Sequence, residues 1–327
     1  MRNEVLVTGG AGYIGSHVCK ALAESGFTPI CYDTMEKGHR WAVRWGPLER
    51  GDIGDGARLD EVFARHRPRA IVHLAGYIEV GESVREPERY LHNNSTKTAA
   101  LIEAALRHAV EGLVFSSTCA VYGMPQAEVL SETHAMAPLS PYADSKARVE
   151  AALDRAASRG LRSASLRYFN AAGADPAGEI GEAHAPETHL LPLAADAALG
   201  VAPPLTLLGS DYPTDDGSCV RDFVHVSDLA DGHVRALQWL RRQPSDGLHE
   251  AFNLGSGSGY SVRQAIAETA RIAGHPVPHQ VGPRRPGDSP RLVGDIAKAH
   301  RELGWRPTRD LAAQIEDTLR WRRKMPR

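Results

Sequence analysis

One segment near the N-terminus, Thr8-Gly-Gly-Ala-Gly-Tyr-Ile-Gly15, constrains the fold of this 327-residue chain more than any other feature. The β-branched residues before it predict a strand over 4–8, and the pattern after it predicts a helix over 13–25. A glycine-rich turn between a strand and a helix presents the free N–H groups of the helix N-terminus to an anion. The segment therefore predicts a phosphate-binding turn.

The glycines and one acidic residue further along indicate which ligand the turn binds. Gly9 and Gly12 allow a tight turn and a close approach of the backbone to a pyrophosphate, and Gly15 lets the helix pack closely on the sheet. Asp33 ends a second expected strand, 18 residues after Gly15. Its carboxylate can accept hydrogen bonds from a ribose diol and would repel a 2′-phosphate, so the pattern predicts NAD rather than NADP.

Short apolar runs alternate with amphipathic segments through the first half of the chain. Further strands are expected before Asp52 and over about 70–75, 113–117 and 162–168, with further helices over about 55–66, 90–109 and 140–160. The alternation implies right-handed crossovers and predicts an α/β fold with a doubly wound parallel Rossmann sheet. Asp52 and Ile53 end the third strand region, where they can meet the adenine of the cofactor.

The composition changes after about Ala171. Glycine, proline and acidic residues are frequent as far as Gly217, with one helix expected near 193–199. We therefore expect an NAD-binding Rossmann domain over residues 1–172 and a smaller C-terminal α/β domain for the substrate over 173–327. Some segments of the later half are expected to return to the sheet.

A tyrosine and a lysine one helical turn apart are the candidate catalytic pair. Tyr142 and Lys146 share one face of the helix expected over 140–160. The pKa of a free tyrosine is about 10, and an adjacent ammonium and a positive nicotinamide ring both favour the phenolate. Thr118 follows the strand over 113–117, so its hydroxyl can bridge Tyr142 and a substrate. Together these residues predict redox chemistry on a hydroxyl-bearing carbon.

Further motifs extend this pattern over nearly the whole chain. They are Val80-Gly-Glu-Ser-Val84, Phe115-Ser-Ser-Thr-Cys-Ala-Val-Tyr-Gly123, Leu166-Arg-Tyr-Phe-Asn170, Gly209-Ser-Asp-Tyr-Pro-Thr-Asp-Asp-Gly217, Val220-Arg-Asp-Phe-Val-His-Val-Ser-Asp-Leu-Ala230, Asn253-Leu-Gly-Ser-Gly257 and Arg284-Arg-Pro-Gly-Asp288. With the glycine segment, they resemble the extended short-chain dehydrogenase/reductase family and, within it, the UDP-glucose 4-epimerases.

The resemblance implies NAD-dependent interconversion of UDP-glucose and UDP-galactose, a step of galactose metabolism. Tyr142 would remove the proton of the sugar 4-hydroxyl while C4 gives a hydride to NAD, and the hydride would return to the other face of a 4-keto sugar. Lys146 would tune Tyr142, and Thr118 would help to relay the proton. Because NAD ends each cycle as it began, tightly bound NAD is expected. Further implied cofactor contacts are Tyr13, Ile14, Ala75, Gly76, Asn93 and Phe169.

The same cycle requires that the nucleotide stay anchored while the hexose turns, so the binding energy should lie on UDP. The resemblance implies that Arg221 and Arg285 clamp the diphosphate, since guanidinium pairs with phosphate in a fork, and that Asp288 takes the uridine ribose. Further implied substrate contacts are Asn170, His189, Leu190, Thr206, Leu207, Leu208 and Leu292. Leu292 replaces a tyrosine of members with narrow specificity, which suggests room for an N-acetyl group.

Several alternatives compete with this interpretation. Related nucleotide-sugar dehydratases carry an Asp-Glu pair after the threonine, where this chain has Cys119 and Ala120, which argues against that activity. A 4-epimerase of a UDP-N-acetylhexosamine, a UDP-pentose or a UDP-hexuronic acid stays open. A non-catalytic sensor of NAD or nucleotide sugars is the alternative from another class.

Bulk properties exclude other classes of protein. A net charge of −2 and a pI near 6.7 suggest no nucleic-acid or membrane surface. The four cysteines fit neither a zinc site nor a disulfide framework. His17, His73, His225 and His233 form no helix-spaced ligand pair, so no metal is expected. We expect a cytoplasmic protein without a membrane span and, by resemblance, a homodimer.

Overall fold

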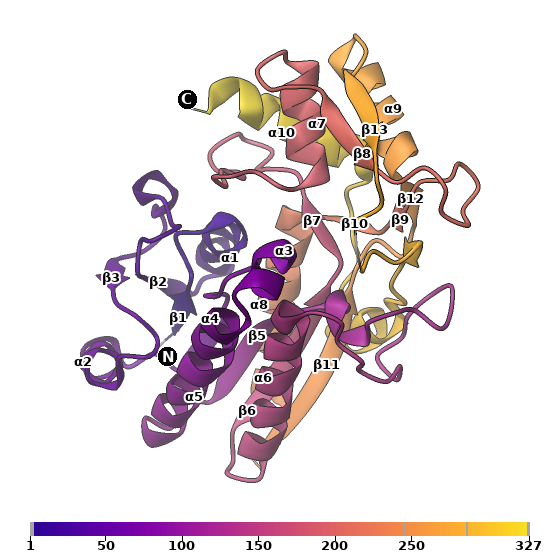
Figure 1. Ribbon diagram of the computed structural model, residues 1–327. Helices are drawn as coiled ribbons and strands as arrows, with labels where there is room; N and C mark the ends of the chain where they lie inside the picture. The colour runs from indigo at the N-terminus through magenta and orange to yellow at the C-terminus, as the bar shows by residue number, and fades with distance from the viewer. Residues whose placement is uncertain (1–2, 245, 286, 326–327) are drawn as a thin grey trace.

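A seven-stranded parallel sheet forms the centre of the computed structural model, which describes residues 3–244, 246–285 and 287–325 (Figure 1). Its strand order is β11-β6-β5-β4-β1-β2-β3. The strands are β1 (Glu4–Thr8), β2 (Thr28–Asp33), β3 (Leu48–Arg50), β4 (Ala70–His73), β5 (Gly112–Thr118), β6 (Arg162–Tyr168) and β11 (Leu248–Leu254). The α/β class with a doubly wound parallel sheet, predicted from the sequence, is confirmed.

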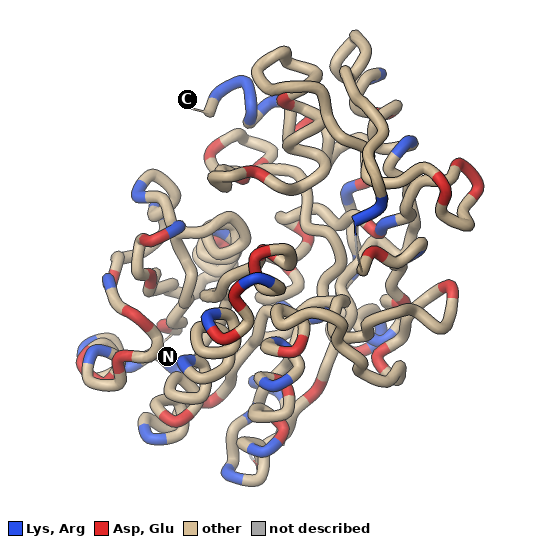
Figure 2. Tube along the Cα trace, in the orientation of Figure 1, with Lys and Arg blue, Asp and Glu red and all other residues tan. Residues whose placement is uncertain are grey.

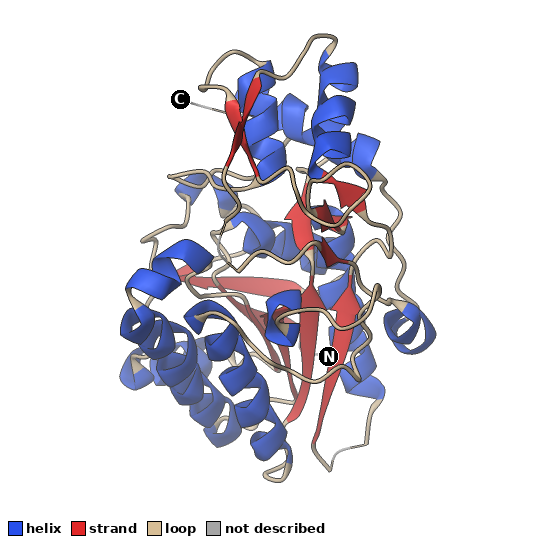
Figure 3. Cartoon of the chain, turned by 45° about the vertical axis from the view of Figure 1, so that its right-hand side comes forward, coloured by secondary structure: helices blue, strands red, loops and turns tan. Residues whose placement is uncertain are grey.

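Helices cover both faces of this sheet (Figure 3). One face carries α1 (Tyr13–Glu24) and α8 (Val226–Arg242), and the other carries α2 (Gly56–His66), α5 (Lys97–Arg107) and α6 (Pro141–Ala157), with the short α3 (Val80–Arg85) and α4 (Pro87–Leu91) beside α6. Within β1, Val5 and Val7 join the core under α1 and α8, whereas Leu6 joins the opposite core. A strand buried on both faces is apolar throughout, which explains the run Val5–Val7.

Capping side chains set the starts of two helices where the sequence predicts them. Asp55 accepts a hydrogen bond from the backbone N of Arg58 at 3.0 Å, and Ser140 accepts one from Ala143 at 3.2 Å. The helix expected over 90–109 is interrupted instead, because a π-helical turn, η2 (His92–Thr96), separates α4 from α5. Such turns often lie at functional sites.

The second part of the molecule lies beyond the carboxyl ends of the sheet strands (Figure 1). Its short strands are β7 (Asn170–Ala172) with β10 (Phe223–His225), β12 (Tyr260–Ser261) with β9 (Val220–Arg221) and β14 (Arg291–Leu292), and β8 (Leu205–Leu208) with β13 (His279–Gly282). Its helices are α7 (Leu190–Ala198), α9 (Val262–Ala273) and α10 (Leu311–Lys324), and the single turns elsewhere are η1 (Arg40–Ala42), η3 (Cys119–Tyr122) and η4 (Ala299–Leu303).

Two later segments lie with the first half of the chain. Strand β11 pairs with β6 in parallel, and α8 packs against α1. The expected division near residue 172 stays a prediction.

Charged residues of both signs are interspersed along the trace (Figure 2), as the small net charge suggests. No helix within the described ranges has the length and apolar character needed to cross a membrane.

Candidate active site

The glycine turn packs closely against neighbouring backbone because its glycines carry no side chains. Gly9 has a φ of 71°, and a Cβ there would lie 2.7 Å from the backbone N of Ala75. A Cβ on Gly15 would lie 2.0 Å from the carbonyl oxygen of Gly9. Gly12 is the N-cap of α1 and makes no side-chain cap bond. The first N–H groups of α1 are thus left for an anion, and the turn fits the pyrophosphate of a dinucleotide.

Asp33 stands at the end of β2, where the sequence predicts the ribose contact. Its Oδ2 accepts a hydrogen bond from Ala11 N at 3.0 Å, and its Oδ1 accepts one from Met35 N at 2.8 Å. A carboxylate has about four lone-pair sites, so these two bonds leave acceptors for a diol. Gly38 also belongs to this site, because a Cβ there would lie 2.9 Å from Asp33 Oδ1. The sequence interpretation missed Gly38.

The expected adenine contacts follow β3. The Asp52 carboxylate pairs with the Lys97 ammonium, and its backbone carbonyl accepts a hydrogen bond from the Tyr32 hydroxyl at 2.9 Å. Ile53 is buried beside them. Asp52 and Lys97 also line a hollow of about 400 Å³ together with His92 and Thr96. The hollow therefore includes Asp52, where the sequence predicts a contact with the adenine.

Tyr142 and Lys146 lie in the first two turns of α6, and Thr118 ends β5. Burial raises the pKa of Tyr142 to about 12, although a hydrogen bond with Thr118 opposes the shift. Lys146 is 4% exposed and donates a hydrogen bond from Nζ to the carbonyl oxygen of Ser116 at 2.8 Å. Burial lowers the pKa of Lys146 to about 8, with the charge of Glu150 opposing. The lysine thus ties the catalytic face of α6 to the end of β5, where Thr118 stands.

The lowered pKa that the sequence suggests for Tyr142 is not produced by the groups of the protein. The penalty for burying a charged phenolate outweighs the hydrogen bond with Thr118, and Lys146 directs its ammonium at a backbone carbonyl. The positive nicotinamide ring is the other contribution that the sequence interpretation named, and it belongs to the cofactor.

Asn94 connects the cofactor loop to the catalytic helix, and the sequence interpretation missed it. Its Oδ1 accepts a hydrogen bond from Tyr77 N at 2.8 Å, and its Nδ2 donates to Tyr77 O at 3.0 Å and to Ser145 Oγ at 3.1 Å. A Cβ on Gly76 would lie 3.1 Å from Asn94 Oδ1 and 3.8 Å from Lys146 Nζ. The predicted contacts Ala75 and Gly76 are therefore held beside α6, on a turn shaped by η2.

Asn93, Tyr13, Ile14 and Phe169 complete the predicted cofactor set. The Asn93 side chain donates to Asn94 Oδ1 at 3.1 Å, so it lies next to the same loop. Tyr13 begins α1 and donates its hydroxyl to the carbonyl oxygen of Gly173 at 2.6 Å, and Ile14 packs against the core under α1. Phe169 is 8% exposed in the cluster that contains Cys119.

A buried ion pair joins the catalytic helix α6 to strand β6. Glu150, two turns after Tyr142, pairs with Arg167 of β6 at 2.6 Å, and both side chains are at most 7% exposed. The Ser117 hydroxyl donates to Glu150 as well, next to Thr118. These contacts fix α6 against the ends of β5 and β6. The pair could not be predicted from the sequence, because α6 carries several other charged residues and Glu150 does not stand out among them.

The predicted diphosphate contacts gather around one carboxylate. Arg221 donates from Nη1 to the carbonyl oxygen of Ser289 at 2.9 Å, and its Nη2 lies 3.4 Å from Asp288 Oδ1. Arg285 donates to the same Oδ1 at 2.8 Å. Leu292 faces Arg221 in the β9–β14 register. The structure thus brings Arg221, Arg285, Asp288 and Leu292 together.

This substrate end meets the catalytic end at Cys119. Leu292 packs against the cluster of Cys119 and Phe169, which begins one residue after Thr118. Burial raises the pKa of Cys119 to about 12, and the charge of Arg221 opposes the shift. On the adjoining strand, Asn170 donates from Nδ2 to the carbonyl oxygen of Asp222 at 3.0 Å.

The remaining predicted substrate contacts differ in how accessible their side chains are. Thr206 and Leu208 are exposed along β8, whereas Leu207 is 1% exposed in the core beneath α7 and α9. The side chain of Leu207 packs in that core, and its predicted contact with the uracil stays a prediction. His189 caps α7 beside Leu190 and has its Nδ1 2.7 Å from Glu182 Oε1 and 2.9 Å from Glu187 Oε1.

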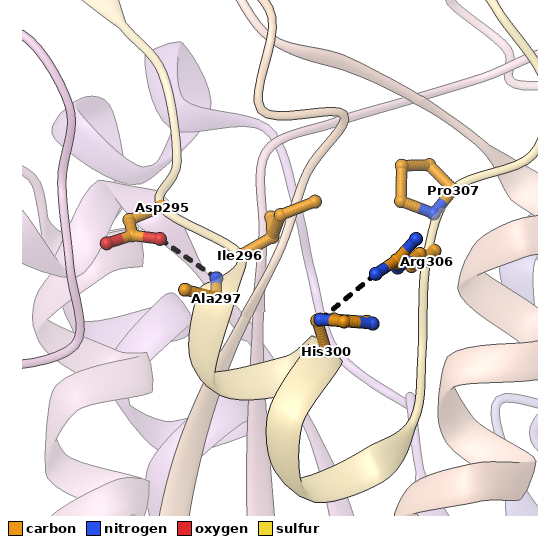
Figure 4. Close-up of a pocket in the computed structure, with 6 residues that line it drawn as sticks. All are labelled: Asp295, Ile296, Ala297, His300, Arg306 and Pro307. Atoms are coloured by element: carbon orange, nitrogen blue, oxygen red, sulfur yellow. Dashed lines mark hydrogen bonds between the residues drawn. The ribbon is translucent and has the colours of Figure 1, made fainter.

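A separate hollow of about 450 Å³ lies beside η4 (Figure 4), lined by Asp295, Ile296, Ala297, His300, Arg306 and Pro307. Its polar groups bond to one another, with Asp295 accepting from Ala297 N at 2.8 Å. It contains none of the predicted site residues, so it carries no part of the chemistry above.

Known proteins match this chain over nearly its whole length. The profile of the NAD dependent epimerase/dehydratase family matches residues 5–255. A UDP-glucose 4-epimerase of Rhizobium meliloti is 50% identical over 320 residues, which cover 98% of this chain and 97% of the relative. The crystal structure of UDP-glucose 4-epimerase from Brucella ovis in complex with NAD has a TM-score of 0.93 at 44% identity and 97% coverage of both chains. The Bifidobacterium longum UDP-glucose 4-epimerase in complex with NAD⁺ and UDP has a TM-score of 0.92 at 34% identity and 98% coverage of both chains.

Proposed function

Since this chain belongs to the NAD dependent epimerase/dehydratase family, we propose that it interconverts UDP-glucose and UDP-galactose by inverting C4 of the hexose. One observation carries the proposal: Thr118 ends β5, and Tyr142 and Lys146 begin α6, at the carboxyl edge of the sheet where the glycine turn opens. Ligands of open α/β sheets bind at this edge.

The glycine turn, Asp33 and the loop at Gly76 fit NAD as the resident cofactor. When bound, NAD would supply the hydride acceptor for the sugar C4 and the donor for the return step. The turn would hold the pyrophosphate, because no side chain occupies the space beside Gly9 and Gly15. Asp33 would accept hydrogen bonds from the ribose hydroxyls.

The proton is handled by the chain itself. Tyr142 takes it from the sugar 4-hydroxyl as general base, and Thr118 bridges the phenol and the sugar oxygen. Lys146 Nζ is held by Ser116 O on the catalytic face of α6, and the positive nicotinamide ring would supply the charge that favours the phenolate. In the return step Tyr142 protonates O4.

The nucleotide end supplies the anchor. Arg221 and Arg285 already converge on the Asp288 carboxylate, so a diphosphate can replace part of that pairing with charge-assisted bonds. The hexose carries no such clamp and is free to turn. Inversion requires this contrast, because the same sugar must present both faces of C4.

The test is incubation of the purified protein with UDP-galactose without added cofactor, followed by separation of the nucleotide sugars. UDP-glucose should appear, because the NAD is retained through purification. No UDP-glucose, even after NAD is added, would refute the proposal. A UDP-N-acetylhexosamine as the principal substrate is not favoured by the relatives above.

A homodimer and a cytoplasmic location complete the proposal. The family resemblance supports the dimer, which light scattering on a size-exclusion column would test at micromolar protein concentration. A mass equal to one 35.4 kDa chain at all concentrations would contradict it. Cell fractionation tests the location.

A further inference from the structure

A second cluster of ionisable groups lies in the segment between β7 and α7. Glu182, His184, Glu187 and His189 each place one nitrogen or oxygen atom within 4.8 Å of the other three. We propose that these four side chains bind one Zn²⁺ ion. The site would be structural, since it lies outside the catalytic residues and offers four protein ligands.

The donor set selects the metal. Two imidazole nitrogens and two carboxylate oxygens form a four-coordinate set of the kind that zinc takes, whereas Mg²⁺ and Ca²⁺ prefer six or more oxygens. Four ligands from the chain leave no open position for a water molecule, which is typical of structural rather than catalytic zinc.

Three pairs of donor atoms are closer than the ligands of a zinc ion would be. Glu182 Oε1 lies 2.9 Å from His184 Nδ1 and 2.7 Å from His189 Nδ1, and Glu187 Oε1 lies 2.9 Å from His189 Nδ1. Ligands about 2.0–2.1 Å from zinc are roughly 3.3 Å apart in a tetrahedron. These three pairs would therefore separate by about half an ångström, and the other pairs already lie within 4.8 Å.

A separate observation indicates that the cluster lacks a partner. Glu187 Oε2 is buried, and no hydrogen-bond donor for it exists among the described residues. The Glu187 side chain is 8% exposed and that of Glu182 is 4% exposed. A buried carboxylate oxygen without a partner is unfavourable. A cation bound through Oε2 would satisfy it, while Oε1 keeps the bonds that it accepts from the backbone N–H groups of Thr188 and His189.

A proton is the competing occupant. Burial alone would lower the pKa of His189, but its bonds to Glu182 and Glu187 raise that pKa to about 10. Burial would raise the pKa of Glu182, but bonds with His184 and His189 lower it to about 2. Without metal, the cluster is a protonated network; zinc would displace the proton. The two states differ in metal content, which can be measured directly.

Zinc at this position would fix the start of α7 against the cofactor helix. The His184 ring lies edge-on to Tyr13 of α1, with 6.3 Å between centroids. His189 is the N-cap of α7. It would then serve as a metal ligand instead of the sugar contact expected from the sequence. No metal is expected from the sequence, because only histidines at helical spacing enter that prediction. The proposed ligands instead follow the pattern Glu182-x-His184-x-x-Glu187-x-His189.

The first test is zinc binding by the tag-free full chain after dialysis against a chelator. Calorimetric titration should give one zinc per chain with a dissociation constant below about 1 µM. Glu187→Gln and His184→Gln should each weaken binding at least about tenfold. His108→Gln is the matched control, because His108 Nε2 also pairs with a carboxylate, Asp60, at 2.7 Å, and its zinc binding should equal that of the wild type.

Cobalt provides a second readout that does not depend on variants that fold. Co²⁺ bound to the wild type should show the strong visible absorption of tetrahedral cobalt, and added zinc should abolish it. No stoichiometric zinc uptake, no such absorption, or ligand variants that bind zinc like the wild type would each overturn the proposal. Neither measurement uses turnover, so failure here leaves the proposed epimerase activity untouched.

Discussion

On the cofactor side, Gly9, Gly12 and Gly15 leave space for a ligand because they carry no side chains. On the substrate side, the buried carboxylate of Asp222 holds the backbone in place by accepting hydrogen bonds. Asp222 is 0% exposed, and its Oδ1 accepts from Ser256 N at 2.6 Å while its Oδ2 accepts from Gly294 N at 3.2 Å. Burial raises the pKa of Asp222. The cofactor side therefore depends on the absence of side chains in the glycine turn, and the substrate side depends on the hydrogen bonds that Asp222 accepts. We call Asp222 and the groups that donate to it the hub.

The two designs differ in the sequence distance that they bridge. The three glycines lie within seven residues, so their geometry follows from one local turn. Asp222 gathers segments 34 and 72 residues further along the chain. Damage to the turn should therefore remove the cofactor, and damage to the hub should loosen the nucleotide sugar while NAD remains bound.

The largest expected effect is on turnover and comes from Tyr142, which lies between the cofactor side and the substrate side. Tyr142→Phe should lower turnover of UDP-galactose by about 10²–10⁴-fold, because it removes the general base. Bound NAD, measured by release on denaturation, should stay at the wild-type level. Tyr90→Phe is the control, since that hydroxyl contacts Glu79 and Glu82; it should turn over normally. Retained activity in Tyr142→Phe would assign the base elsewhere.

Gly15→Ala should break the cofactor side. Its Cβ would lie 2.0 Å from Gly9 O, and that oxygen belongs to the backbone, which cannot move aside as the end of a flexible side chain can. We expect protein purified without NAD and a free energy of unfolding lowered by up to about 3 kcal/mol. Gly56→Ala is the matched control, because nothing lies within 4 Å of its added Cβ at the start of α2. It should gain up to about 1 kcal/mol in urea unfolding. Equal behaviour of the two variants would refute the steric argument.

Asp222→Asn should break the substrate side. In the native protein, Gly257 N and Gly294 N donate hydrogen bonds to the Asp222 carboxylate at 3.1 and 3.2 Å. The asparagine amide keeps one acceptor oxygen, but its NH₂ group is a donor and would face these two N–H groups. We expect a loss of about 2–3 kcal/mol in urea unfolding and a KM for UDP-galactose that rises more than kcat falls, with NAD retained. Asp231→Asn, an exposed i,i+4 partner of Arg235, should change stability by less than about 0.5 kcal/mol. Loss of NAD in Asp222→Asn would remove the distinction between the two sides.

The same contrast explains how far the sequence could be interpreted. Strand periodicity, the caps Asp55 and Ser140, and the acid at Asp33 are local patterns, and the structure places each of them as expected. The helix interrupted at η2 was not foreseen, because Asn94 serves a loop 17 residues earlier. A polar residue inside a helix does not reveal which distant backbone it holds.

The pairing of buried charged groups also could not be predicted from the sequence. Glu150 and Arg167 look like ordinary surface charges until β6 and α6 pack together. Their partnership depends on tertiary contacts, as does that of Glu182 with His189. The roles of Arg221 and Arg285 came from resemblance alone, and their convergence on Asp288 supports those roles without testing them.

The smallest predicted effect uses pH to separate the two sides. Burial lowers the pKa of His17 to about 4, of His73 to about 3 and of His233 to about 4, and all three lie under or beside the sheet. A lowered folded pKa means that the native state holds the neutral ring, so the stability is full above the unfolded pKa near 6.5 and is lost as pH falls toward 3–4. Each histidine should remove at most about 2 kcal/mol by pH 5.

His73→Gln should flatten this acid dependence, because the ring that bonds Thr8 Oγ1 at 2.7 Å and Thr98 Oγ1 at 2.8 Å no longer titrates. The measurement is urea unfolding at pH 8 and pH 5. The free-energy difference between the two pH values should shrink by up to about 2 kcal/mol relative to the wild type. His17 lies on α1 and His73 bonds to Thr8 beside the glycine turn, so acid should release NAD before it weakens binding of UDP. The reverse order, or an unchanged difference in His73→Gln, would show that the buried rings do not set the acid limit of that side.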